Sequence, residues 1–255
     1  MAGDAKIVLD GVKKAFGSNH VLDGVDLEIE RGESMAIIGQ SGSGKSVTLK
    51  CILGLVRPDA GAIRVDGEDI SSMSTRDMER IRAKFGMLFQ GSALFDSLPI
   101  WRNVTFALTQ GRMLDARNMR KIAAENLERV GLGSEVLDLR PSELSGGMQK
   151  RVALARAIAP RPEIIFFDEP TTGLDPIRAD VINDLIVELV EDLGVTALTI
   201  THDMASARKI GDEIAMLHAG KIVWRGAPTE LDRTDNPYVR QFVDGRADGP
   251  MASMV

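Results

Sequence analysis

The stretch MAIIGQSGSGKS, residues 35–46, decides the fold of this 255-residue chain. Its first four residues are apolar and predict a strand that is buried on both faces. Apolar residues at Val47, Ile52 and Leu55 then recur at helical spacing. Between strand and helix lies a complete G-x-x-x-x-G-K-S motif. Strand, glycine-rich loop and helix in this order predict a phosphate-binding loop in an α/β fold of the P-loop NTPase type.

The residues of this loop are suited to binding the phosphates of ATP. Glycines let successive backbone N–H groups turn inward around phosphate oxygens, and the helix N-terminus adds its positive dipole end. We expect Lys45 to reach the β- and γ-phosphates and the Ser46 hydroxyl to bind Mg²⁺. A chance Gly/Ser turn is the alternative, and the flanking elements argue against it. The predicted nucleotide-binding residues here are Gly39, Gln40, Ser41, Gly42, Ser43, Gly44, Lys45, Ser46 and Val47.

Two carboxylates follow the apolar run Ile164–Phe167 directly, at Asp168 and Glu169. Ligands of open α/β sheets bind outside the carboxyl ends of the strands, which is where these acids are expected. Asp168 suits the Mg²⁺ shell, and Glu169 is placed to orient or activate an attacking water. Two acids at an ordinary strand end are the alternative, which the phosphate loop makes less attractive.

A third motif is Leu144-Ser-Gly-Gly-Met-Gln149, in which a serine and two glycines precede a helical pattern. It predicts a second helix N-terminus that can bind an anion. One chain does not obviously need two such sites for one ATP. Judged by these residues alone, a plain N-cap is the better interpretation.

Composition bounds the function classes. Hydrophobic residues make up 44% and charged residues 27% of the chain, as in an ordinary globular protein. The net charge of −6 disfavours a nucleic-acid surface. The single cysteine, Cys51, excludes an internal disulfide, favours a reducing compartment and is expected to be a core residue. Neither a signal-peptide pattern nor an apolar run of about 18–20 residues occurs, so we expect another chain to span any membrane.

Strand and helix patterns alternate along the chain. Strands are expected at 25–29, 35–38, 63–65, 85–89, 164–167 and 195–201, with a hairpin at 214–224. Helices are expected at about 117–130, 147–159 and 176–193, with a possible capping box at Ser74-x-x-Asp77 before Met78 and Ile81. Residues from about 91 to 157 therefore form a helical insertion. The tail after Gly245, rich in Gly, Ala, Pro and Met, is expected to be poorly ordered.

In their order and spacing these motifs resemble the ATP-binding-cassette family over about residues 6 to 232. The phosphate loop is followed by Gln90, the Ser145-Gly146-Gly147 signature, Asp168-Glu169, a D-loop at 172–175 and His202. The resemblance implies one ATPase domain over 6–245 and a C-terminal extension over 236–255. Within that domain it implies a core with an antiparallel β subdomain, at about 6–90 and 158–235, and a helical subdomain at about 91–157.

The resemblance also implies roles. Two copies would join head to tail and sandwich two ATPs, so that Ser145, Gly146 and Gly147 of one copy bind the γ-phosphate held by the other. Gln90 would sense the γ-phosphate and Mg²⁺, and His202 would stabilise the hydrolytic geometry. Asp175 of the D-loop is included in the nucleotide site. Phe16 stands where the family places an aromatic ring against adenine, although a core residue at a strand end is the alternative. His20 and His218 have no motif support and are read as structural or exposed.

The runs at 144–158, 90–98 and 239–250 are similar to the ATPases of Mla-type, MCE-associated phospholipid transporters. This similarity implies a permease, a STAS-domain regulator, an MCE-domain protein and a position on the inner face of a bacterial inner membrane. Met148 replaces the usual Gln of the family, which leaves the Ser-Gly-Gly turn intact. Arg102 stands where relatives carry Glu, which concerns detail at the permease contact rather than the chemistry.

Three rival functions stay open. One is the ATPase of a small-solute importer, and another is a non-transport protein of the same family that acts on nucleic acid or ribosomes. The third is a P-loop kinase or GTPase, which would not explain the signature followed by the acidic strand end. The surface beside Gln90, which includes Phe95–Leu98 and Trp101, is expected to receive a helix of the permease, or its apolar residues pack under the helical insertion.

Overall fold

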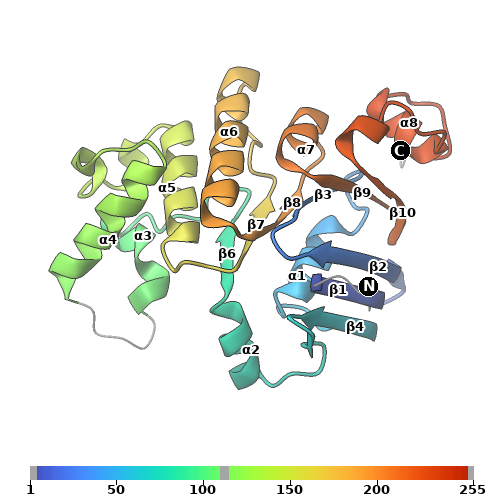
Figure 1. Ribbon diagram of the computed structural model, residues 1–255, viewed down its shortest axis with the longest axis horizontal. Helices are drawn as coiled ribbons and strands as arrows, with labels where there is room; N and C mark the ends of the chain where they lie inside the picture. The colour runs from blue at the N-terminus through green and yellow to red at the C-terminus, as the bar shows by residue number, and fades with distance from the viewer. Residues whose placement is uncertain (1–4, 110–114, 252–255) are drawn as a thin grey trace. The chain divides into compact units, whose positions relative to one another are not determined.

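The computed structural model describes residues 5–109 and 115–251, which fall into two compact units (Figure 1). Unit 1 combines the chain up to residue 82 with the chain from residue 198 onward, and unit 2 is the continuous stretch 83–197. Within the described ranges, no helix has both the length and the apolar character that crossing a membrane requires.

Unit 1 contains an antiparallel sheet in the order β2-β1-β4-β5. Its strands are β1 (Ala5–Phe16), β2 (Asn19–Glu30), β4 (Ala60–Val65) and β5 (Glu68–Asp69). The alternation predicted for residues 25–29 is confirmed, because Val25, Leu27 and Ile29 are buried whereas Asp26 and Glu28 are exposed. One face of this sheet therefore carries core side chains.

A second group of strands in unit 1 carries the phosphate loop. β3 (Ser34–Ile38) is buried at all five positions and pairs in parallel with β9 (Glu213–His218). β10 (Lys221–Gly226) returns antiparallel to β9, as the predicted hairpin requires. The helices of this unit are α1 (Lys45–Ile52), α2 (Thr75–Arg82), α7 (Met204–Ile210) and α8 (Pro237–Val243), with a 3₁₀ turn at Pro228–Glu230.

Two local predictions in unit 1 have different outcomes. The Ser74 cap is confirmed, because its hydroxyl accepts from the Asp77 N–H at 3.2 Å and donates to the Asp77 carboxylate at 2.6 Å. The helix predicted to reach Leu55 is shorter and ends at Ile52. A closing turn in which the Leu55 N–H donates to the Lys50 carbonyl at 2.9 Å leaves the Leu55 side chain 60% exposed.

Unit 2 contains a parallel strand pair and most of the long helices. Its strands are β6 (Phe85–Leu88) and β7 (Ile164–Asp168), and its helices are α3 (Ile100–Val104), α4 (Ala116–Arg129), α5 (Gly146–Ile158) and α6 (Pro176–Leu193). Three 3₁₀ turns lie at Phe106–Thr109, Ser134–Val136 and Pro141–Glu143. β6 ends one residue earlier than predicted. The predicted helices are confirmed to within one residue, and α3, α4 and α5 lie together in Figure 1.

β8 (Thr196–Ile200) crosses the division between the units. Its first residue, Thr196, donates its N–H to the Glu163 carbonyl at 3.2 Å within unit 2. Just past its end, the Thr201 N–H donates to the Ile37 carbonyl at 3.1 Å within unit 1. All five residues of β8 are buried, which fits the apolar run predicted there.

The expectation of a poorly ordered tail after Gly245 is wrong as far as residue 251. The Gln241 amide is buried, and its Nε2 donates to the carbonyls of Arg246, Ala247 and Met251 at 3.2–3.3 Å. Its Oε1 accepts from the Met251 N–H at 2.8 Å. The Met251 side chain, 2% exposed, packs in a core cluster with Val239. One buried amide thus satisfies the backbone of a turn without regular structure.

Cys51 lies on α1 and is 2% exposed, as expected for a core residue. Burial raises the pKa of its thiol to about 11. Because the thiolate is the reactive form, we expect the native protein to react slowly with Ellman's reagent at about pH 8. The same protein in denaturing guanidinium should react completely and fast. Equal rates in the two conditions would contradict the buried position of Cys51.

Candidate functional site

The phosphate loop connects β3 to α1 through backbone conformations that favour glycine. Gly39 has φ 153°, and a Cβ there would lie 2.3 Å from the Leu217 carbonyl oxygen. Gly44 caps α1 with φ 108°, and a Cβ there would lie 2.9 Å from the Val21 carbonyl oxygen. Both contacts are with backbone that cannot move aside, so the two glycines are needed for close packing as well as for the turn.

The lysine and serine side chains of the loop fit a phosphate ligand. Lys45 is only 7% exposed, and its Nζ donates to the carbonyls of Gly39 at 2.6 Å and Gln40 at 3.0 Å. The Ser43 hydroxyl is buried and has no hydrogen-bond partner among the residues that the structure describes. A buried orphan hydroxyl is costly, and a phosphate oxygen would satisfy it.

Two further predicted residues belong to unit 1. His202 follows β8 and is exposed. Phe16 ends β1 with 51% exposure, and the Lys14 ammonium lies 5.4 Å from its ring centre. Its exposure argues against the alternative of a core residue. His20 is exposed and His218 packs against Tyr238 with ring centres 4.8 Å apart, as the absence of motif support suggested.

In unit 2, the acidic pair stands at the end of β7. Asp168 is the last residue of the strand and is half-buried. Glu169 follows in the left-handed region with φ 49°, and the Thr172 hydroxyl donates to its Oε2 at 3.3 Å. A non-glycine residue in this region carries strain of about 1–3 kcal/mol, and such residues concentrate at active sites.

The signature turn begins α5. Ser145 is the N-cap, and its hydroxyl accepts from the Met148 N–H at 3.3 Å. A Cβ on Gly146 or Gly147 would meet no atom within 4 Å, so the turn faces open space. The plain N-cap interpretation is therefore correct as a description of this chain by itself. The open turn also leaves room for an anion at a helix N-terminus.

Gln90 follows β6 and is exposed. Its backbone carbonyl accepts from the Lys150 ammonium at 2.5 Å. Lys150 lies on α5 and is 5% exposed, and sequence reasoning assigned it no role. Burial lowers the pKa of Lys150, while the charges of Asp168 and Glu169 act in the opposite direction. Within unit 2, Lys150 of the signature helix thus binds the Gln90 carbonyl and interacts electrostatically with Asp168 and Glu169.

Asp175 acts as the N-cap of α6, where its carboxylate accepts from the Arg178 N–H at 3.1 Å and pairs with the Arg178 guanidinium. Within one copy of the chain, Asp175 therefore serves to cap α6. Its contact with nucleotide stays a prediction.

The apolar residues near Gln90 are divided in their exposure. Trp101 is 7% exposed, and the guanidiniums of Arg102 and Arg120 lie 5.0 and 5.7 Å from its ring centre. Phe95 is 40% exposed and contacts Phe106 with ring centres 4.3 Å apart. Packing is therefore the correct alternative for Trp101, whereas Phe95 keeps part of its surface available.

The donors predicted for Mg²⁺ are oxygen atoms of Ser46, Gln90 and Asp168, the ligand type that this hard cation prefers. Residues 5–109 and 115–251 contain no group of three His, Cys, Asp or Glu side chains that would hold a metal by themselves.

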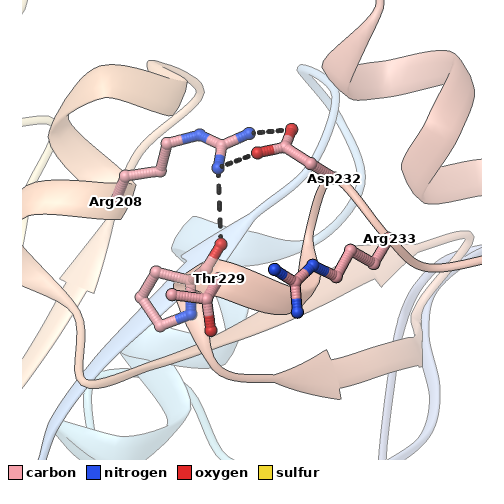
Figure 2. Close-up of a pocket in the computed structure, with 5 residues that line it drawn as sticks. Arg208, Thr229, Asp232 and Arg233 are labelled. Atoms are coloured by element: carbon pink, nitrogen blue, oxygen red, sulfur yellow. Dashed lines mark hydrogen bonds and ion pairs between the residues drawn. The ribbon is translucent and has the colours of Figure 1, made fainter.

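A hollow of about 450 Å³ lies on unit 1 near the 3₁₀ turn at 228–230 (Figure 2). Arg208 and Asp232 form a two-point ion pair across it, at 2.7 and 3.0 Å, and Arg208 also donates to the Pro228 carbonyl at 3.3 Å. The guanidinium lowers the pKa of Asp232. None of the predicted site residues lines this hollow, and its central charges already neutralise each other.

Comparison with known proteins identifies the family. Residues 22–172 match the family model described as "ABC transporter". The chain belongs to this family. It is an ATP-binding-cassette ATPase, as the order of motifs predicted.

Three relatives give the range of similarity. The "Intermembrane phospholipid transport system ATP-binding protein MlaF" of Escherichia coli K12 is 43% identical over 92% of this chain and 87% of its own. The "Probable ribonucleotide transport ATP-binding protein mkl" of Mycobacterium leprae is 41% identical over 96% and 70%. The chloroplast protein "TRIGALACTOSYLDIACYLGLYCEROL 3" of Arabidopsis thaliana is 38% identical over 97% and 76%.

A solved structure supports the fold. The ATP-binding cassette MJ0796, described as a dimer in a post-hydrolysis state with ADP and Pi, matches with a TM-score of 0.79 and 34% identity. The match covers 87% of this chain and 98% of that one. The predicted fold class, an ABC-type P-loop ATPase, is confirmed.

Replacing Lys45 tests the phosphate loop. In Lys45→Ala we expect ATP affinity to fall about 10- to 100-fold, because a charge-assisted bond to phosphate is worth about 1.5–3 kcal/mol. Isothermal titration with a non-hydrolysable ATP analogue measures the loss. The exposed Lys121→Ala, on α4, is the control that keeps wild-type affinity. Unchanged affinity in Lys45→Ala would remove the lysine from its assigned role.

Proposed function

We propose that this chain is the ATP-hydrolysing subunit of a transporter that moves phospholipid between membranes of a bacterial envelope. The observation that carries the proposal is the similarity to MlaF over 92% of the chain, together with an intact set of ATPase motifs. The chain would lie on the inner face of the inner membrane, attached through a permease. A STAS-domain regulator and an MCE-domain protein are further expected partners, and nucleic acid is not.

The chemistry is transfer of the γ-phosphoryl group of ATP to water. The water oxygen forms a bond to the γ-phosphorus, the bond to the β,γ-bridging oxygen breaks, and ADP and phosphate leave with one proton released. Lys45, the loop N–H groups and the Ser43 hydroxyl hold the phosphates. Glu169 orients the water and takes up its proton. Mg²⁺, held by Ser46, Gln90 and Asp168 with the phosphates, would neutralise charge on the β- and γ-phosphates.

Closure would require a second copy of the chain. The solved cassette that resembles this one is a dimer. In such an arrangement the open Ser145-Gly146-Gly147 turn of one copy would bind the γ-phosphate of the ATP held by Lys45 of the other copy. His202 would contact the γ-phosphate of the ATP that its own copy holds. Asp175 lies in the D-loop beside the nucleotides, and Phe16 would stack its exposed ring on adenine. Hydrolysis then releases the closed state, and the permease converts this cycle into movement of substrate.

The Glu169→Gln variant separates binding from hydrolysis. Its amide occupies the same space but cannot accept a proton, so we expect turnover to fall about 10²- to 10⁴-fold. Binding of ATP should persist, and the dimer held by ATP should accumulate. Phosphate release and size-exclusion chromatography with MgATP measure the two effects. Turnover at the wild-type rate would show that another residue handles the water.

The substrate is tested by purification of tagged Glu169→Gln protein from native membranes in mild detergent, followed by mass spectrometry of proteins and lipids. We expect a permease, an MCE-domain protein and bound phospholipid. Wild-type protein prepared in the same way is the control for capture that depends on the ATP-bound state.

Other outcomes would overturn the substrate assignment in different ways. A permease together with a solute-binding protein would indicate an importer of small solutes. Bound nucleotides at the permease would favour the transport named for the mycobacterial relative. Absence of any membrane protein would favour a role outside transport.

A further inference from the structure

The segment after β6 has an unusual backbone. Ser92 and Ala93 both lie in the left-handed region, with φ 61° and 48°. Two successive residues with side chains rarely adopt this conformation, because the Cβ crowds the following carbonyl oxygen. Such a turn persists only where its surroundings hold it. The segment begins at Gln90, two residues earlier.

Arg156 on α5 holds this turn. Its two terminal nitrogens donate to the Ser92 and Ala93 carbonyls, each at 2.6 Å. The planar guanidinium matches two neighbouring acceptors in a fixed geometry, which a lysine cannot do. Burial lowers the pKa of Arg156, so the charge is held in a site that penalises it. The left-handed conformation of Ser92 and Ala93 is therefore stabilised by a side chain of α5.

Lys150 holds the start of the same segment. Its buried ammonium donates to the Gln90 carbonyl at 2.5 Å, a short charge-assisted bond. Asp168 and Glu169 supply the opposite charge nearby. The two cations are six positions apart on α5, and together they bind three carbonyls between residues 90 and 93.

Both cations lie on α5, which begins at the signature turn and packs closely against β6. Lys150 is five residues after the Ser145 cap. At the other end, the backbone of α5 lies against β6, since a Cβ on Gly86 would be 2.5 Å from the Ala157 carbonyl oxygen. α5 is therefore one rigid connection between the signature turn and the segment 90–93.

We propose that Lys150 and Arg156 are positioning residues that fix Gln90 relative to the signature turn, so that engagement of Ser145 by a γ-phosphate is transmitted to Gln90 through α5. The catalytic part of this inference rests on the roles proposed above for Gln90 and Ser145. The mechanical part, the attachment of residues 90–93 to α5, does not. The two parts have separate measurements.

Amide hydrogen exchange tests the attachment. In the full-length chain without nucleotide, Lys150→Met and Arg156→Met should exchange at residues 90–94 about tenfold faster than wild type. The matched control is Arg151→Met, because Arg151 lies on the same helix and its NH1 donates to the Val130 carbonyl at 2.5 Å, away from the segment. The control should leave exchange at 90–94 unchanged even where it lowers Tm.

Steady-state kinetics test the transmission. We expect both variants to lower kcat about tenfold while KM for ATP changes less than about twofold. The reason is that the variants would misplace Gln90 in the closed dimer and leave the initial binding of ATP intact. Arg151→Met should keep the wild-type kcat. Should either methionine variant fail to fold, Arg156→Lys and Lys150→Gln replace it, since each retains one donor for the segment.

Unequal results separate the two parts. Faster exchange at 90–94 with unchanged kcat would overturn the transmission, because Gln90 would then work without a fixed position. Exchange and kcat matching those of Arg151→Met would overturn the whole proposal. Restoration of slow exchange by Lys150→Gln and Arg156→Lys, in proportion to the donors retained, would support it.

Discussion

The phosphate loop depends on two places where backbone lies directly against backbone. Gly39 lies against the Leu217 carbonyl of β9, and Gly44 lies against the Val21 carbonyl of β2. These contacts leave no room for a side chain, so the loop takes its shape from the strands behind it. The orphan Ser43 hydroxyl and the α1 N-terminus are held at the same place. The shape of the proposed phosphate site is thus set by packing within unit 1.

Both units use buried ammonium groups in the same way. Lys45 binds the carbonyls of Gly39 and Gln40, and Lys150 binds the carbonyl of Gln90. Burying a cation costs solvation free energy, which carbonyl dipoles recover only in part. Each lysine therefore stabilises an adjacent loop and remains attractive to negative charge. For Lys45 that charge would be the phosphate of the proposed ATP site, whereas for Lys150 it is already present in Asp168 and Glu169.

The sequence predicted the elements whose causes are local. Gly, Lys and Ser at fixed spacing predict the phosphate loop, and the Ser145 cap predicts a helix start, because each depends on a few neighbouring residues. The sequence could not decide what depends on packing in the folded chain. The order of the tail depends on the Gln241 amide, and the two alternatives left open for Trp101 were decided by its burial. Lys150 and Arg156 stand within a quoted motif, yet long cations on helices usually extend to solvent.

Strain marks the functional side of unit 2. Among the described residues, six non-glycine positions have positive φ, and three of them, Ser92, Ala93 and Glu169, lie in the segments that follow β6 and β7. Ligands of parallel sheets bind at these carboxyl ends, so the strained residues are at the edge where chemistry is expected. Arg156 holds the strained pair after β6, and the Thr172 hydroxyl contacts Glu169. Strain persists only where such contacts over-determine the backbone, so these loops are pre-shaped by contacts within unit 2 rather than by the ligand. The position of the Gln90 loop is therefore set by α5 of the same chain before any nucleotide binds.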